Sequence, residues 1–261
     1  MAGSPAPTPS NPATHPRQRY ARPPVVEAVV DIHADVPENL SLETLAQIYS
    51  DEDQRYPVRE SLIGHSITVD ASSGLAVKTG QEVVGHRYMN ASRDVIVQVR
   101  RNGFSYSKLP PYRSWEEDVL PEAQRLWSRY AEITRPVAIK RLAVRYINRI
   151  DLPPRGAFEQ YFTVYPNQPG SMPEPLINFV MRLEIPQTAF HGGMLILTQG
   201  RLLSEQKDVF PVLLDLDLSQ IVQMPADGAK LWQAIERLHA RMNEVFEGCI
   251  TPTARAIFQP C

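Results

Sequence analysis

The 261-residue chain has few cysteines, no excess of charge of one sign and no long apolar run. Cys249 and Cys261 are its only cysteines, too few for the disulfide framework of a secreted domain. The formal net charge of -2 provides no general attraction to nucleic acid or to an anionic membrane. No apolar run approaches the roughly 18 residues of a membrane-spanning helix, and no signal segment opens the chain. These absences predict a cytoplasmic protein that does not enter membranes.

The sequence also lacks the standard short motifs of catalysis and cofactor binding. It has no GxxxxGKS/T phosphate loop, no GxGxxG, no HExxH, no GxSxG and no paired CxxC. The stretch His191-Gly-Gly193 is similar to an oxyanion loop, but a turn between two strands explains it more simply. The sequence therefore predicts no cofactor, no metal and no catalytic residue, and a non-enzyme is the favoured interpretation.

Proline is concentrated at the N-terminus, where the first two dozen residues contain seven prolines and no acidic residue. Such a composition cannot bury a core, so residues 1–22 are expected to form a disordered arm. The remainder divides into 23–136 and 137–261, and each part has strand-like segments followed by a helical one. We interpret them as two duplicated β-meander-plus-helix halves, which can also form a single domain. Both predicted helices end at Ile-Thr followed within two residues by a proline, at 133–136 and 250–252. The competing interpretation is that this likeness is a coincidence.

Periodicity predicts the elements of both halves. In the first half, alternation predicts a half-buried strand over 25–34, and Ser41 is expected to begin a short helix. A Ser114/Glu117 capping box predicts a longer helix, kinked at Pro121. Further strands are predicted at 74–77, 85–91, 94–107, 158–165, 178–185, 193–199 and 212–219, and a helix closes the second half. This order predicts an α+β fold in which one or more antiparallel sheets are covered on one face by long helices.

The most informative stretch is RLAVRYINRI, residues 141–150. Alternation in a strand places Arg141, Arg145 and Arg149 on one face and apolar residues with Tyr146 on the other. Asn148 is expected to end this strand. A row of three arginines meets either carboxylates or a ligand, so this face is the candidate binding surface.

Two other predicted strands carry acids at matching spacing. Glu27 and Asp31 share one face of the first strand, and Asp215 and Asp217 share one face of the last. These four carboxylates can neutralise the arginines across a sheet. Alternatively, Asp215 and Asp217, helped by Glu27, Asp31 and His33, can hold a divalent cation or divide acid and base roles.

Basic residues surround aromatic ones elsewhere, a combination that can stack bases and hold phosphates. They are Arg100, Arg101, Lys108 and Arg113 with Phe104, Tyr106 and Tyr112. Aromatic residues in a strand more often belong to the core, so nucleic acid is only a secondary prediction.

Four segments together resemble a sporadically distributed bacterial family of uncharacterised proteins. They are PPVVEA at 23–28, LPPYRSWE at 109–116, the arginine strand at 141–150 and LLDLD at 213–217. The resemblance spans roughly residues 20–251, and Arg-x-x-x-Arg-Tyr-Ile-Asn is its most specific element. It implies no established activity and no catalytic residues. The patchy distribution of the family implies an accessory role.

The leading hypothesis is a cytoplasmic binding or accessory protein. Its arginine-bearing sheet face, or a groove beside it, would engage an anionic or polar partner, either a protein or a ligand. One alternative is a metal-assisted hydrolase of phosphate esters that uses the Asp/Glu cluster. Another is a structural homodimer in which the last helix packs against its copy.

Overall fold

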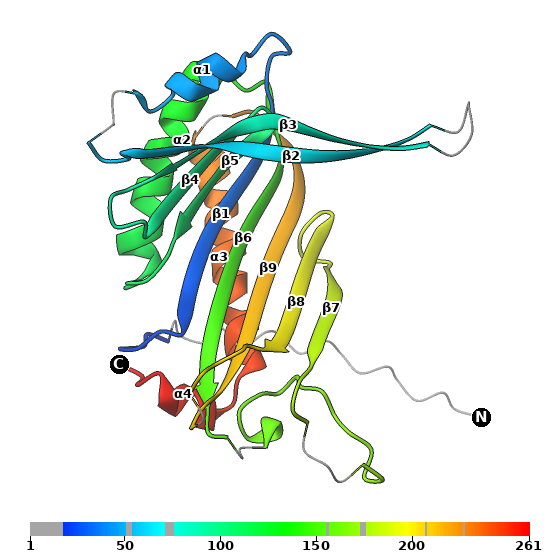
Figure 1. Cartoon of the computed structure of the whole chain (residues 1–261). Coiled ribbons are helices and arrows are strands. Elements are labelled where there is room, and N and C mark those ends of the chain that lie inside the picture. Colours follow the sequence, from blue (N-terminus) through cyan, green and yellow to red (C-terminus); the bar gives the residue numbers. More distant parts are fainter. Residues whose placement is uncertain are drawn as a thin grey trace, which may run out of the picture.

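The computed structural model describes residues 18–50, 54–70, 76–154, 157–172, 176–206, 208–226 and 228–261, with the backbone alone over 65–70 and 76–79. These residues form one antiparallel sheet with strand order β2-β3-β4-β5-β1-β6-β9-β8-β7 (Figure 1). The strands are β1 Val25–Asp35, β2 Val58–Asp70, β3 Ala76–Met89, β4 Val95–Arg100, β5 Gly103–Lys108, β6 Ala138–Leu152, β7 Val180–Gln187, β8 Gly193–Arg201 and β9 Phe210–Met224. The protein is α+β and mostly sheet.

The helical segments lie between the runs of strands and after the last strand. They are α1 Leu42–Gln47, the π-helical turn η2 Trp115–Val119, α2 Leu120–Thr134, the 3-10 turn η3 Phe158–Gln160, α3 Gly228–Cys249 and α4 Pro252–Ile257. In Figure 1, α2 and α3 lie behind the sheet, and its other face is turned toward the viewer. No helix in the described part of the chain is long and apolar enough to cross a membrane.

The two halves of the chain form the two sides of the sheet, and on each side the strands follow the same pattern outward from the centre. The first strand of the half is innermost, its last strand comes next, and the others follow in reverse order. β1 and β6 pair at the centre, and the last strand of each meander returns beside the first, so that β5 pairs with β1 and β9 with β6. The boundary expected after residue 136 falls between α2 and β6. Duplication of the two halves stays a prediction.

The hydrophobic core lies between the sheet and the helices. On β6, Leu142, Val144 and Ile150 are fully buried, as alternation predicts. From α3, buried residues recur at three- and four-residue steps: Leu231, Ile235, Leu238 and Met242. Full burial of one such side chain contributes about 2 kcal/mol, so these two stripes hold the helix against the sheet.

The predicted helix starts agree with the structure. The Ser41 side chain accepts a hydrogen bond from the backbone of Thr44, and Ser114 accepts one from the backbone of Glu117. Pro121 is the second residue of α2, just after the π-helical turn η2 that begins the helix. The kink expected at Pro121 stays a prediction.

The sequence analysis missed one strand and misplaced two other features. β2 was not predicted at all; its pairing with β3 shifts register between Leu62 and Ile63, which breaks the alternation that marks a strand. The strand expected over 158–165 is the short turn η3 followed by a single bridge from Phe162 to Ile250. Asn148 does not end β6, which continues to Leu152.

The remaining predicted elements lie close to observed ones. The stretch His191-Gly-Gly193 forms the β7–β8 turn, which confirms the turn interpretation, and Gly192 adopts a φ of 57° that glycine tolerates without strain. The prediction over 74–77 falls partly outside the described residues, and β3 begins at Ala76.

The described start of the chain pairs with its end. Ala21 and Arg22 donate backbone hydrogen bonds to the carbonyls of Gln259 and Phe258, each at 2.9 Å. Of the predicted arm, residues 1–17 lie outside the described residues. Residues 18–22 are therefore held against the C-terminal segment, beside the start of β1 (Figure 1).

Candidate functional site

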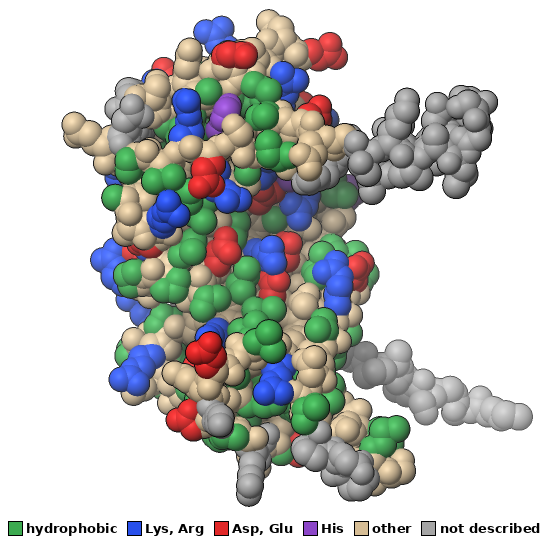
Figure 2. All heavy atoms as spheres, viewed as in Figure 1, with side chains coloured by type: hydrophobic (Ala, Val, Ile, Leu, Met, Phe, Trp, Pro, Cys, Tyr) green, Lys and Arg blue, Asp and Glu red, His purple; other side chains and the backbone are tan. Residues whose placement is uncertain are grey.

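All seven residues predicted to form the binding surface lie on β1, β6 and β9, at positions that alternate with buried ones. These three strands are neighbours in the sheet, with β6 in the middle. The arginines of β6 therefore stand between the acids of β1 and those of β9. Figure 2 shows the result, with acidic and basic side chains interleaved across the middle of the open face. We call this group the open-face cluster: Glu27, Asp31, Arg141, Arg145, Arg149, Asp215 and Asp217.

Two of the three arginines contact the predicted acids. Arg145 makes a two-pronged pair with Asp215, with Nε 2.8 Å from Oδ1 and Nη2 2.6 Å from Oδ2. Arg141 lies between Asp31, at 3.3 Å, and Asp217, at 3.9 Å. A bidentate arginine–carboxylate pair is the strongest geometry available to such side chains. The sheet itself thus supplies carboxylate partners for these arginines.

The other predicted members are arranged differently. Arg149 pairs with Asp151 of its own strand, with Nε 2.8 Å from the carboxylate. Glu27 lies in register with Ile147, and its charge helps to raise the pKa of Arg145, although the main cause is the hydrogen bond to Asp215. Arg149 is therefore paired with a carboxylate outside the predicted set, and Glu27 acts on Arg145 through its charge.

Asp31 is the centre of the cluster, and one of its partners was not predicted. Arg100 of β4 reaches its Oδ2 at 2.6 Å, and His33 lies 2.9 Å from its Oδ1. Burial works to raise the pKa of Asp31, but the hydrogen bond from His33 and the charge of Arg100 outweigh burial and hold the pKa below its usual value. Asp31 is therefore an ionised carboxylate that joins three strands.

Asp217 has a weaker contact with an arginine than Asp31 or Asp215 has. Its Oδ1 is buried and accepts no hydrogen bond, and the contact at 3.9 Å with Arg141 is an ion pair without a hydrogen bond. Burial raises the pKa of Asp217, and the neighbouring charges of Asp215 and Asp31 add to this effect against the opposing arginines. The charges on this face are thus compensated unevenly.

Asp215 and Asp217, the predicted metal pair, lie beside Arg145 and Arg141. Among the described residues, no group of three or more His, Cys, Asp or Glu side chains is placed to hold a metal ion. The metal-assisted hydrolase stays a prediction.

The covered face of β6 opens on a cavity of about 570 Å³. Its walls come from β6, from η2 and the loop before it, from α3 and from residues 18–25. Tyr146 and Asn148, which alternate with the arginines of the open face, both line it. We call this space the Tyr146 cavity.

A row of polar side chains crosses the wall of the Tyr146 cavity. The hydroxyls of Tyr112 and Tyr146 lie 3.3 Å apart, and the Tyr146 hydroxyl lies 3.2 Å from Nδ1 of His239. On the other side of the imidazole, Nε2 lies 3.2 Å from the Asn243 amide nitrogen. Four side chains from three parts of the chain are thus joined within hydrogen-bonding distance.

His239 is fixed by stacking as well as by hydrogen bonds. Its ring lies parallel to Trp115, with centroids 4.1 Å apart and an interplanar angle of 6°, and only 4% of the residue is exposed. The Trp115 indole N–H donates to Glu236 at 2.8 Å. Trp115 comes from η2, a π-helical turn, which is a local geometry found often at functional sites.

Sequence reasoning missed these residues. His239 falls within the apolar stripe of α3, between Leu238 and Met242, where a polar ring is out of place. A polar ring in an apolar stripe was the sequence feature that could have pointed to this cavity. Tyr146 was correctly expected on the buried side, at 7% exposure, but its hydroxyl was given no role.

The outer wall of the cavity is formed in part by the N-terminal segment. Tyr20 donates a hydrogen bond from its hydroxyl to Glu247 of α3 at 2.6 Å, and its ring packs edge-on against Phe246 and Phe258. Burial raises the pKa of the Tyr20 hydroxyl, and the Glu247 carboxylate raises it further. The ionised Tyr20 is therefore disfavoured, and the hydroxyl remains a donor.

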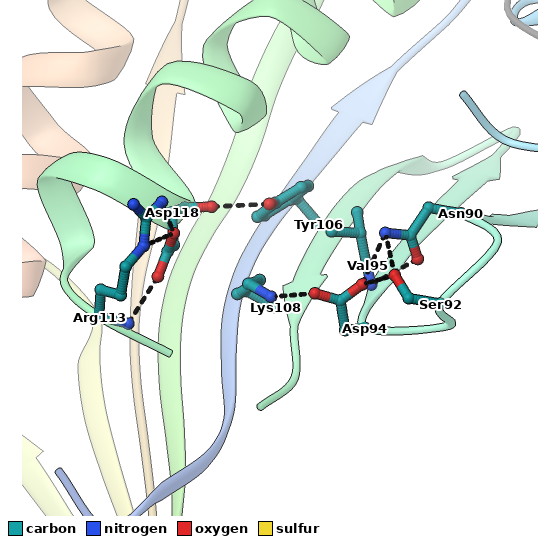
Figure 3. Close-up of polar contacts among 8 residues, drawn as sticks. All are labelled: Asn90, Ser92, Asp94, Val95, Tyr106, Lys108, Arg113 and Asp118. Carbon is teal, nitrogen blue, oxygen red and sulfur yellow. Dashed lines mark hydrogen bonds and ion pairs between the residues drawn. The ribbon is translucent and has the colours of Figure 1, made fainter. Parts of the chain in front are cut away.

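A second cavity, also of about 570 Å³, lies beyond Arg113 and is lined mostly by charged residues. Figure 3 shows that its polar groups are directed at one another. Lys108 contacts Asp94, and Arg113 binds Asp118 through Nε at 2.9 Å and through its backbone N–H at 2.6 Å. The Tyr106 hydroxyl donates to the backbone carbonyl of Asp118 at 2.7 Å. The contact of Tyr106 ties β5 to η2, and that of Lys108 ties β5 to the turn before β4.

The aromatic residues of the secondary nucleic-acid prediction lie mostly in the core. Phe104 is fully buried and Tyr106 is 1% exposed. Neither ring is open to stacking by a base. Tyr112 instead lines the Tyr146 cavity.

Comparisons with known proteins gave no match: no family model, no curated protein and no solved structure is similar to this chain. The resemblance to a bacterial family stays a prediction.

Proposed function

We propose that this protein binds a small organic molecule in the Tyr146 cavity. The observation that carries the proposal is the row from Tyr112 through Tyr146 and His239 to Asn243, which lines a partly open cavity bounded in part by aromatic rings. Small-molecule sites are concave and mostly apolar, with a few placed polar groups that orient the ligand. A volume of about 570 Å³ lies within the range of such sites.

The character of these polar groups supports binding over a purely structural role. Hydroxyl, imidazole and amide groups can each donate or accept, so they can exchange a partner with a ligand at little cost. In the open-face cluster, by contrast, a ligand for Arg145 has to displace its bidentate partner Asp215. Leaving a partly buried charge without its partner is costly.

A neutral probe tests the proposal. Indole-3-ethanol combines an aromatic body with one hydroxyl, and we expect isothermal titration to give saturable binding to the wild-type protein. Ala240→Trp places a large ring at a residue that lines the cavity, and it is expected to abolish this binding. Ala229→Trp makes the same change at an exposed position of α3 outside the cavity, and it should bind like the wild type.

The hydroxyl row has its own test. Tyr146→Phe removes one hydroxyl and leaves the ring, so we expect affinity for indole-3-ethanol to fall about fivefold, the equivalent of one neutral hydrogen bond. If both tryptophan variants bind like the wild type, or if no protein binds the probe, the proposed site is wrong.

We propose as a second candidate that the open-face cluster engages a polar protein partner, as the accessory-protein hypothesis holds. The supporting observation is exposure, since the side chains of Arg145 and Arg149 are 42% and 38% accessible in spite of their pairs. Arg145→Ala is expected to abolish partner capture in a pulldown, whereas Arg182→Ala, an exposed arginine of β7, should not. Circular dichroism checks that both variants fold. Unfolding of Arg145→Ala would assign this arginine a structural role instead.

A further inference from the structure

Carboxylates outnumber cationic groups along the wall of the Tyr146 cavity. Six charged residues line it, and four are acidic. They are Glu116, Glu117, Glu244 and Glu247, against Arg19 and Arg113. Of the four acids, Glu244 and Glu247 are partly buried, so their charges are screened less by water than those of the exposed Glu116 and Glu117.

The cations that pair with two of these acids stand behind them. Glu244 binds Arg241 at 2.8 Å and Glu247 binds Arg255 at 2.7 Å, yet neither arginine lines the cavity. A ligand in the cavity is therefore closer to the carboxylates than to their partners. Because Coulomb energy falls with distance, the nearer charge dominates.

The two lining arginines do little to reverse this balance. Arg113 directs its guanidinium at Asp118, as Figure 3 shows, and also pairs with Glu117 at 3.0 Å. Arg19, Glu116 and Glu117 are all exposed, so water screens their charges. The partly buried acids Glu244 and Glu247 therefore decide the balance, and an anionic ligand would lie close to both of them.

Aromatic rings form much of the remaining wall. Tyr20, Tyr112, Trp115, Tyr146 and Phe246 all line the cavity. The face of an aromatic ring carries partial negative charge, so a cation packed against one is attracted to it. An aromatic lining therefore accommodates a cation, the sign of charge that the carboxylates also favour.

From this lining we infer that the ligand is an organic cation, a protonated amine carried on an aromatic or apolar body. The inference rests on the proposed function, since it specifies the ligand of the same cavity. The amine would lie near the glutamates, the body would pack against the rings, and the hydroxyl row would orient it.

Three indole compounds that differ in charge provide the test. Tryptamine is protonated at pH 7, indole-3-ethanol is neutral and indole-3-acetate is anionic. Titrated into the wild-type protein, they should bind in that order, with at least about a tenfold span in affinity from first to last. Raising the salt from low to high concentration should narrow the span, because ions screen the charged contacts.

The outcomes separate the two proposals. Equal affinity for all three compounds, or tightest binding of the acetate, overturns the cation preference while indole-3-ethanol still supports the cavity. Failure of all three to bind overturns the proposed function and the inference with it.

Charge-removing variants sharpen the test. Glu244→Gln keeps the size of a lining side chain, so tryptamine affinity should fall about fivefold while indole-3-ethanol affinity stays unchanged. Glu184→Gln removes an exposed carboxylate of β7 outside the cavity and should change neither. An equal loss for both ligands in Glu244→Gln would show that the variant distorts the cavity, and would count against a charge contact.

Discussion

The two faces of β6 carry polar residues in different settings. On the open face, Arg141 and Arg145 lie against carboxylates from the strands on either side. On the covered face, Tyr146 and Asn148 carry no charge and line a cavity. One alternating strand therefore contributes ion-paired side chains to the open face and uncharged polar side chains to the cavity on the covered face.

The two faces differ in how their polar groups are partnered. A row of arginines is easily recognised in a sequence, but carboxylates of a neighbouring strand can pair with them. A neutral polar group inside a core is less conspicuous, yet its burial has a cost unless it finds a hydrogen bond. The Tyr146–His239 contact satisfies that demand and leaves the polar edge of the row on the cavity wall.

We expect the largest effect on stability from a substitution at the centre of the open-face cluster. Asp31→Ala leaves Arg100 and Arg141 without this shared carboxylate, and the Arg100 and Asp31 side chains are each only 19% exposed. We expect the free energy of unfolding in denaturant to fall by about 3 kcal/mol. Asp151→Ala removes the exposed partner of Arg149 and should cost less than about 1 kcal/mol. Similar losses in both variants would mean that Asp31 is not central.

The second prediction compares two neighbouring acids of β9. Asp215→Asn breaks a bidentate pair and should cost about 1.5 kcal/mol. Asp217→Asn removes a carboxylate with a buried, unbonded oxygen, so the unfolding free energy should stay unchanged or rise. Equal destabilisation by both substitutions would contradict the uneven compensation described above.

The third prediction concerns the covered face. Tyr146→Phe removes the hydroxyl that lies between Tyr112 and His239, and should lower the unfolding free energy by about 1 kcal/mol. A double-mutant cycle with His239→Gln isolates the pair, and the two effects should be coupled by at least about 0.5 kcal/mol. Additive effects would show that the contact contributes nothing of its own.

How far the sequence could predict these two faces depends on the range of the interactions. Alternation is local, so the sequence alone could place the arginines on one side of the strand and Tyr146 on the other. Pairing is not local: Arg100 reaches Asp31 because β5 places β4 near β1, and nothing close to Arg100 in the sequence indicates that order.

The Tyr146 cavity depends on a contact between residues that lie still farther apart in the sequence. His239 meets Tyr146 only because α3 packs across β6 with one particular face, 93 residues along the chain. The stripe of α3 predicts which side is buried, but not which strand lies beneath each residue. A histidine within an apolar stripe was the only local sign of the site.

The smallest expected effect is a difference in pH dependence between two acids of the open face. The pKa of folded Asp31 is lowered, so its stabilising effect is complete above its ordinary pKa and is lost as pH falls through the folded value. The stability advantage of the wild type over Asp31→Asn should therefore shrink in acid.

The pKa of Asp217 is shifted in the opposite direction from that of Asp31. Its folded pKa is raised, so its charge is unfavourable above that value, and the penalty disappears as pH falls to its ordinary pKa and below. The gain from Asp217→Asn should be largest at neutral pH and vanish near pH ~3. Denaturant unfolding of the wild type and both variants from neutral to acidic pH measures both trends. If the Asp217→Asn difference grows in acid, this carboxyl is better compensated than its position beside Asp215 and Asp31 implies.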